Sequence, residues 1–361
     1  MGSIQIEFPI RNEENNFLQA MQLPGSAVLC LVLKAVIELD LFEIMAKAGP
    51  NAQISASEIV TSLPTSNPEA PLVLDRMLRF LASYSILKCS VVIDEEGNDK
   101  RLYSLTPICS NYIRNEDGFA IAPYLLAQFD KVFMQAWYQL KDSVLEGGTP
   151  FNREYGMHAF EYPGKDSRFN DVFNKGLQNL TGVTMKIILE VYKGFDGIEE
   201  VIDVGGGYGA SLAWIVSKYP KIRGINFDLP HVIKDAPAIQ GVEHVEGNMF
   251  ESVPKVKTIF IKLILHDWDD DHCIRLLKNC FEALPNCGKV ILVESILPES
   301  PQSDCVSNIS FYFDIMMMTY NPGGRERTLK QFEALAKSAG FSAIKPIRQA
   351  YFYWVIEVYK N

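Results

Sequence analysis

The alternation of short apolar segments with amphipathic helical segments from residue 199 onward constrains the fold most strongly. The predicted strands cover residues 200–204, 224–228, 242–246, 258–265 and 289–294. The predicted helices cover residues 211–218, 232–236, 271–283, 309–319 and 328–339. This βαβ rhythm predicts an α/β fold with a doubly wound parallel sheet. Two strands at the end of the chain, 342–347 and 351–358, follow one another directly and predict an antiparallel hairpin at the sheet edge.

The N-terminal third of the chain is predicted to be mainly helical and to end in a hairpin. Ser55 and Glu58 form a capping box that opens a helix over 56–63. A second helix over 70–83 precedes two short strands, 89–94 and 101–105. Two helices followed by a hairpin resemble a winged helix.

Charge argues against the DNA-binding function that a winged helix normally implies. The net charge is -10, the second helix is mostly apolar, and residues 95–99 at the hairpin tip are acidic. Phosphate binding depends on clustered Lys and Arg, so a nucleic-acid partner is not expected. The apolar helix and the apolar stretch 27–44 instead predict burial against a partner, most simply in a homodimer. A DNA-binding or scaffold protein remains an alternative that these features disfavour.

The cysteines and the apolar segments indicate where in the cell the protein is expected to be. The seven cysteines are scattered and odd in number, and no signal-peptide pattern is present, which predicts a reducing, cytoplasmic environment. The stretch 27–44 contains Lys34, Glu38, Asp40 and Glu43, too many charges for a bilayer span. We therefore predict a buried helix there and expect no membrane association.

A glycine-rich turn follows the first predicted strand of the sheet. Gly205, Gly206, Gly207 and Gly209 permit positive φ and close backbone approach to a ligand. Their spacing fits both a dinucleotide and S-adenosylmethionine. An acid ending the next strand, Asp228, can accept from the ribose hydroxyls of either cofactor.

Asp203, two residues before the first glycine, favours one of the two cofactors. A carboxylate there would repel a pyrophosphate, whereas it suits the cationic amino-acid end of S-adenosylmethionine. Methyl transfer is therefore favoured, with hydride transfer by a nicotinamide oxidoreductase and a non-enzymatic sheet protein as alternatives.

His266 lies in the segment Leu265-His266-Asp267-Trp268, at the predicted end of strand 258–265. The carboxyl ends of parallel strands border one crevice, so the glycine turn and His266 are expected to face one another. An imidazole with a reference pKa of about 6.5 can remove the proton of an attacking hydroxyl. A single histidine could equally be a structural polar residue.

Taken together, these segments closely resemble the plant S-adenosylmethionine-dependent small-molecule O-methyltransferases of the caffeic acid type. The resemblance spans nearly the whole chain and rests on residues 203–207, 224–232, 265–268, 278–290 and 321–328. It implies a winged-helix-like dimerisation domain over residues 1–118 and a Rossmann-like methyltransferase domain over residues 119–361. It further implies a cytoplasmic homodimer that uses S-adenosylmethionine, releases S-adenosylhomocysteine and needs no metal.

The resemblance also assigns site residues. His266 would be the base, flanked by the carboxylates of Glu294 and Glu326. The expected cofactor residues are Asp203, from the argument above, and Gly205, Asp228, Leu229, Asn248, Met249 and Lys262. Asn248 departs from the Asp that the family usually has, but an amide oxygen can still accept from the adenine amino group, so weaker binding is expected.

The expected acceptor pocket is rich in Phe and Met, which suits a flat phenylpropanoid. The residues that the resemblance places there are Ala127, Gln128, Ala159, Pro163, Phe169, Phe173, Leu177, Leu180, Met316, Met317 and Asn321. Asp267 is expected to contact the acceptor oxygen that neighbours the reacting one. Pro163 and Leu180 replace histidines that the caffeic acid pattern often has, which favours a neutral alcohol or aldehyde over a carboxylated acid. A monolignol side-chain alcohol, an isoquinoline alkaloid or a flavonoid is an alternative acceptor.

Overall fold

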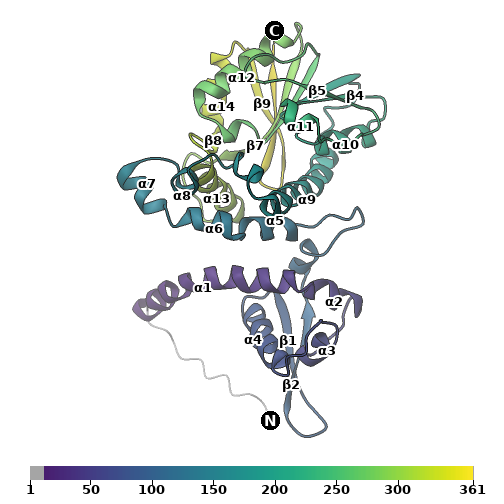
Figure 1. The fold of residues 1–361 in the computed structure, drawn as a ribbon, viewed down its shortest axis with the longest axis vertical. Coiled ribbons are helices and arrows are strands. Elements are labelled where there is room, and N and C mark those ends of the chain that lie inside the picture. The colour runs from purple at the N-terminus through teal and green to yellow at the C-terminus, as the bar shows by residue number, and fades with distance from the viewer. Residues whose placement is uncertain (1–11, 361) are drawn as a thin grey trace. The chain divides into compact units, whose positions relative to one another are not determined.

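The computed structural model describes residues 12–360 and divides into two compact units between Phe129 and Asp130 (Figure 1). The boundary predicted from the sequence lay between residues 118 and 119. Each unit has its own hydrophobic core, built around Leu74 and Leu78 in the first and on the two faces of the sheet in the second.

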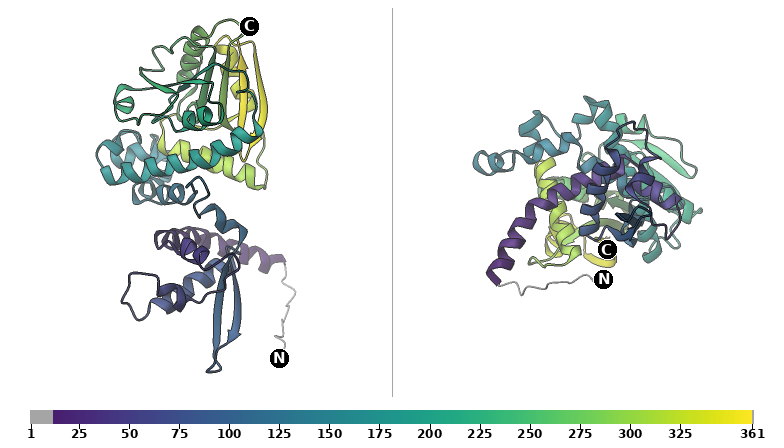
Figure 2. Two further views of the ribbon diagram at one scale, coloured as in Figure 1. Left: turned by 90° about the vertical axis from the view of Figure 1, so that its right-hand side faces the viewer. Right: turned by 90° about the horizontal axis from the view of Figure 1, so that it is seen from below.

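The first unit contains one long helix, several shorter helices and one hairpin. Its elements are α1 (Asn12–Glu38), α2 (Leu41–Lys47), α3 (Ala56–Val60), α4 (Ala70–Ser83), β1 (Leu87–Ile93), β2 (Asp99–Leu105), the 3-10 helix Pro107–Asn111 and α5 (Ala122–Gln128). The Ser55 hydroxyl accepts from the Glu58 amide and the Glu58 carboxylate from the Ser55 amide, which confirms the capping box. The predicted winged-helix-like arrangement is confirmed, with β1 and β2 antiparallel (Figure 2).

The prediction of one buried helix over 27–44 is wrong. The helix breaks at Asp40, whose φ is 53°, and α1 buries only one face, through Leu33, Val36 and Ile37. Elsewhere on α1 the large apolar side chains Phe17, Leu18, Met21, Leu23, Val28 and Leu31 are exposed. Among residues 12–360, Glu14–Glu38 is the one helix long and apolar enough to cross a membrane by those two criteria. The exposed apolar side chains of α1 predict that a further surface covers this helix.

The second unit is built on an eight-stranded sheet with the order β5-β4-β3-β6-β7-β10-β9 and with β8 beside β7. Its strands are β3 (Glu200–Val204), β4 (Arg223–Asp228), β5 (Val242–Glu246), β6 (Thr258–Lys262), β7 (Lys289–Leu297), β8 (Arg327–Thr328), β9 (Ala343–Ala350) and β10 (Tyr353–Tyr359). Strands β3 to β8 pair in parallel, while β10 is antiparallel to both β7 and β9. The predicted C-terminal hairpin at the sheet edge is thus confirmed.

Helices cover both faces of this sheet, as its apolar strands require. On one face pack α12 (Asp270–Ala283) and α14 (Leu329–Ser338), and on the other α9 (Ser167–Val191) and α10 (Ala210–Lys218) (Figure 1). The remaining helices of this unit are α6 (Lys131–Trp137), α7 (Leu140–Glu146), α8 (Pro150–Tyr155), α11 (Pro230–Ile233), α13 (Cys305–Tyr320) and the 3-10 helices Tyr162–Gly164 and Leu265–Asp267.

Strand order reverses between β3 and β6, because the chain runs outward from β3 through β4 to β5 and then returns to the other side of β3. In open α/β sheets, ligands bind outside the carboxyl ends of the strands at such a switch point. The glycine turn after β3 and the segment after β6 both lie there.

Candidate active site

The glycine turn joins β3 to α10 with little space for side chains. Gly205, Gly207 and Gly209 have φ values of 73°, 57° and 84°. A Cβ on Gly205 would lie 2.6 Å from Ile264 Cδ1. The Gly207 amide donates to Asp228 Oδ2 over 2.8 Å, which places the acid ending β4 directly beside the turn. The predicted turn and its acid are therefore together.

Asp203 is fully buried beneath this turn. Burial raises the pKa of its carboxyl, which Lys262 opposes, and its Oδ2 has no hydrogen-bond partner among the described residues. Lys262, also buried, donates to Thr181 Oγ1 over 3.2 Å. A buried carboxyl oxygen that lacks a hydrogen-bond partner among the described residues is a good receptor for an ammonium group. These residues thus fit the amino-acid end of S-adenosylmethionine.

Asn226, in the middle of β4, supports the turn from below and was not expected from the sequence. Its Nδ2 donates to the Gly207 carbonyl over 2.8 Å and lies 3.1 Å from His244 Nδ1. The signal available in the sequence was a polar residue between the apolar Ile225 and Phe227, and in the structure its side chain is fully buried.

The adenine-side residues lie near the carboxyl end of β5. Asn248 Oδ1 accepts from the Phe250 amide over 3.0 Å, and its Nδ2 donates to Glu251 Oε1 over 3.2 Å. The Met249 carbonyl accepts from Asn279 Nδ2. The amide oxygen expected to receive the adenine is therefore shared with a backbone amide, and its role remains a prediction.

His266 does not end a strand, contrary to the predicted strand 258–265. Strand β6 ends at Lys262, Leu263 takes a positive φ of 55°, and His266 lies in a 3-10 turn, Leu265–Asp267. The strand stops because Glu294 Oε1, on β7, accepts from the amides of Ile264 and Leu265 over 3.1 and 2.9 Å. The Glu294 carboxylate thus accepts the hydrogen bonds that the backbone of a neighbouring strand would otherwise accept.

The imidazole of His266 is buried and paired. Its Nδ1 lies 2.8 Å from Glu326 Oε1 and its Nε2 lies 3.7 Å from Asp267 Oδ1. Burial alone would lower the pKa of His266, but Glu326 and Asp267 outweigh burial and raise it to about 10. The predicted pair of His266 and Glu326 is brought together across 60 residues of sequence.

Glu294 lies close to this pair but is bonded differently. One ring nitrogen of His266 and one carboxylate oxygen each of Glu294 and Glu326 lie within 4.8 Å of one another. Burial raises the pKa of Glu294 to about 7. Because its hydrogen bonds go to the backbone of the turn, Glu294 holds the position of His266, whereas Glu326 contacts the ring.

Two expected acceptor residues also meet beside the imidazole. Asn321 Nδ2 donates to Asp267 Oδ1 over 2.6 Å, and both side chains are buried. Burial raises the pKa of Asp267 to about 6. The amide thus orients a carboxylate next to His266 Nε2.

The expected apolar pocket residues come from α5, α9 and α13, from the 3-10 helix Tyr162–Gly164, which holds Pro163, and from the turn at Ala159. Phe169 and Phe173 on α9 pack against Phe133 on α6, with ring centroids 5.0 and 5.7 Å away. Met316 and Met317 on α13 are buried, while Met318 is exposed. Ala159 and Leu180 are buried and Leu177 is exposed. Ala127 and Gln128 belong to α5 in the other unit, so their role remains a prediction.

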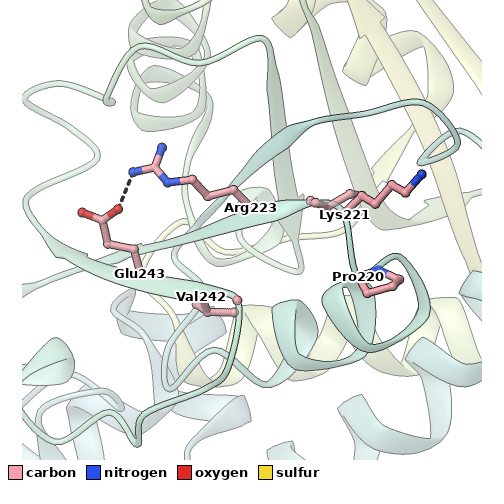
Figure 3. Close-up of a pocket in the computed structure, with 7 residues that line it drawn as sticks. Pro220, Lys221, Arg223, Val242 and Glu243 are labelled. Atoms are coloured by element: carbon pink, nitrogen blue, oxygen red, sulfur yellow. Dashed lines mark hydrogen bonds and ion pairs between the residues drawn. The ribbon is translucent and has the colours of Figure 1, made fainter.

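A separate open depression of about 420 Å³ lies at the opposite end of the strands (Figure 3). Pro220, Arg223, Val242 and Glu243 line it at the amino ends of β4 and β5, and Arg223 pairs with Glu243. It is remote from the carboxyl-end crevice and contains no unpaired buried group.

Comparisons with known proteins agree with this fold. A family model for the O-methyltransferase domain matches residues 137–342, and one for the O-methyltransferase dimerisation domain matches residues 21–115. The chain is 56% identical to a caffeic acid 3-O-methyltransferase of Capsicum annuum over 97% of this chain and 98% of the relative. It is 54% identical to an esculetin O-methyltransferase of Kitagawia praeruptora over 99% and 98%.

Solved structures share the fold. Human N-acetylserotonin methyltransferase, in complex with S-adenosylmethionine, superposes with a TM-score of 0.80 at 21% identity, covering 100% of this chain and 99% of that one. CalO1, a methyltransferase in calicheamicin biosynthesis, gives 0.81 at 19% identity, covering 97% and 100%. The fold, the glycine turn and the family matches together show that this chain belongs to the S-adenosylmethionine-dependent O-methyltransferases.

Proposed function

We propose that this enzyme methylates a hydroxyl of a small plant phenolic, most readily a phenylpropanoid, with His266 as the base. The observation that supports this most is the buried contact of 2.8 Å between His266 Nδ1 and Glu326 Oε1, next to the aromatic and methionine-rich helices α9 and α13. The names of the relatives, which act on caffeic acid and esculetin, support the class of acceptor.

The geometry gives each group a step in the reaction. Glu326 accepts from Nδ1–H, so in the neutral ring, the form that acts as the base, the lone pair of His266 is on Nε2, toward Asp267. Nε2 then takes the proton of the acceptor hydroxyl as its oxygen attacks, and Glu326 stabilises the resulting imidazolium. Asp203 and Asp228 would hold the two ends of the cofactor. When bound, S-adenosylmethionine supplies a methyl group activated by a positively charged sulfur.

A panel of acceptors tests the substrate class. Phenolic acids, hydroxycinnamyl aldehydes and alcohols, flavonoids and isoquinolines are incubated with the enzyme and S-adenosylmethionine, and products are identified by mass spectrometry. The highest kcat/KM is expected for a phenylpropanoid. A clear preference for an isoquinoline or flavonoid would move the acceptor to that class while retaining the enzyme.

The group at the end of the acceptor's side chain, an acid or an alcohol, is the subject of a second prediction. The paired change Pro163→His and Leu180→His adds polar partners to a pocket whose Leu180 is buried, so it is expected to raise the kcat/KM ratio of carboxylated acids over alcohols by roughly 10-fold, the value of one charge-assisted hydrogen bond. Paired phenylalanine substitutions provide a control of similar bulk. An unchanged ratio in the histidine pair would contradict this view of the pocket.

We further propose that the chain acts as a homodimer in the cytoplasm, without nucleic-acid or membrane partners. Support comes from the dimerisation-domain match, the exposed apolar face of α1 and seven unpaired cysteines. Helix α13 also exposes Val306, Ile309, Tyr312, Ile315 and Met318. Apolar side chains on opposite sides of a helix are expected where a second surface covers it.

Charge placed on α1 tests the homodimer. Val28 and Leu31 are about half exposed, so Val28→Glu with Leu31→Glu is expected to leave the monomer folded while converting the dimer to monomer in analytical ultracentrifugation. Ile93→Glu, at an equally apolar and exposed position on the hairpin, is the control and should remain dimeric. A dimer that persists in the double variant would exclude this face.

A further inference from the structure

Three consecutive residues, Arg325, Glu326 and Arg327, hold the turn that carries His266, each in a different way. The Arg325 amide donates to the His266 carbonyl over 2.8 Å. Glu326 contacts the imidazole, as described above. Arg327 reaches past both and contacts the backbone on either side of the turn. Only Glu326 has a role in the proposed reaction so far.

The guanidinium of Arg327 is completely buried and uses its full set of donors. Nη1 donates to the Leu265 carbonyl over 2.7 Å and to the Arg325 carbonyl over 3.4 Å. Nη2 donates to the Trp268 carbonyl over 2.7 Å and to Asp270 Oδ1 over 2.9 Å. Nε donates to the same Asp270 oxygen over 3.0 Å. These five bonds engage the five N–H groups of an arginine.

The acceptors of these hydrogen bonds lie on both sides of His266 and at the start of the next helix. Leu265 and Trp268 immediately flank His266 and Asp267, and Asp270 begins α12. One rigid planar fork therefore ties together both ends of the catalytic turn and the start of the next helix. Because Arg327 opens β8, which pairs with β7 at Ile296, the fork is itself anchored in the same sheet that carries Glu294.

Burying a guanidinium is costly unless its donors are satisfied. Among residues 12–360, the one carboxylate paired with Arg327 is that of Asp270, which is 47% exposed, so most of the compensation comes from backbone carbonyls. Lysine has three donors around one point and cannot reach carbonyls on both sides of the turn.

We infer that Arg327 is a positioning residue for methyl transfer, which fixes the distance and orientation of His266 and Asp267 relative to the acceptor hydroxyl. This inference rests on the proposed function, because it assigns Arg327 a role through His266. A shift of roughly 1 Å in a reacting group costs about 100-fold in rate. Loosening the fork is therefore expected to lower kcat far more than it changes cofactor affinity.

The test compares Arg327→Lys with Arg223→Lys, a surface arginine at the other end of the sheet. Arg327→Lys is expected to lower kcat by about 10- to 100-fold and to leave the Kd for S-adenosylmethionine, by calorimetry, within about 3-fold. Arg223→Lys should match the wild type in both. Equal losses in kcat and in cofactor affinity, or no loss in kcat, would overturn the positioning role.

Two further measurements separate positioning from simple loss of fold. In Arg327→Ala, millimolar methylguanidinium should restore part of kcat in a saturable way, whereas urea at the same concentration should not. Combining Arg327→Lys with Glu326→Gln should give a smaller loss than the product of the single losses, since both act through the same imidazole. Absence of rescue together with multiplicative losses would contradict the inference.

Failure of the inference and failure of the proposed function give different results. The proton in the His266–Glu326 hydrogen bond is observable by NMR far downfield without turnover. If Arg327→Lys leaves both that resonance and kcat unchanged, the positioning role fails and His266 can still be the base. If His266→Ala retains turnover, the proposed base fails whatever Arg327 does.

Discussion

Replacement of His266 by alanine is expected to reduce kcat by about 100- to 10,000-fold. A phenol with a pKa of about 10 is mostly protonated at neutral pH and is then a poor nucleophile. His266, the proposed base, is buried, its Nδ1 contacts the carboxylate of Glu326, and its other nitrogen faces Asp267. Steady-state kinetics with a phenylpropanoid acceptor measures the loss.

Cofactor affinity should be nearly unaffected in this variant. Asp203, Gly207 and Asp228, which fit the cofactor, have no hydrogen bond to the imidazole. The Kd for S-adenosylmethionine is therefore expected within a few-fold of the wild type by calorimetry. His231→Ala, at an exposed histidine on α11, is the matched control and should retain full turnover. Wild-type kcat in His266→Ala would remove the base assignment.

Glu326→Gln is expected to change both the size and the pH dependence of the rate. The carboxylate of Glu326 is the leading group that raises the pKa of His266 against burial, so its loss lowers that pKa. The base must be neutral to act, and activity is therefore lost as pH falls through the pKa of His266. The acid limb of the profile of kcat/KM against pH should move to lower pH in the variant.

The plateau above that limb should fall by about 100-fold or more, because the glutamine neither fixes the tautomer as firmly nor stabilises the imidazolium. The ratio of wild-type to variant activity is thus expected to shrink as the pH is lowered. Glu299→Gln, at an exposed carboxylate after β7, is the control. An acid limb that stays in place in Glu326→Gln would show that His266 is not the group that titrates.

Local patterns were sufficient to predict much of the sheet. Strands β3 and β5 have the predicted bounds, since each is an apolar or alternating run between clear turn signals. The segment after β6 differs because Ile264 and Leu265 are apolar and continue the pattern of the strand. Only the three-dimensional structure shows that Glu294 accepts hydrogen bonds from both of their amides, so that the strand ends and the chain turns before His266.

The cover of α1 and the contacts of Arg327 could not be predicted from the sequence, for two different physical reasons. Apolar residues on α1 predict burial, but the pattern is the same whether its own chain or a partner provides the cover. Arg327 lies in a segment that the family resemblance included, yet nothing local indicates that its donors meet Leu265 and Trp268, some 60 residues earlier. Side chains that hold distant backbone are visible only once the fold brings them together.

Transfer of a labelled methyl group tests the central claim most directly. The enzyme is incubated with S-adenosylmethionine carrying ¹³C in its methyl group and with a phenylpropanoid that bears a free aromatic hydroxyl, and the product is examined by NMR. The label is expected as an aryl methoxyl carbon in the wild type and to be almost absent with His266→Ala. Label that stays in the cofactor with every phenolic tested, or that appears on nitrogen or carbon, would contradict O-methylation by this site.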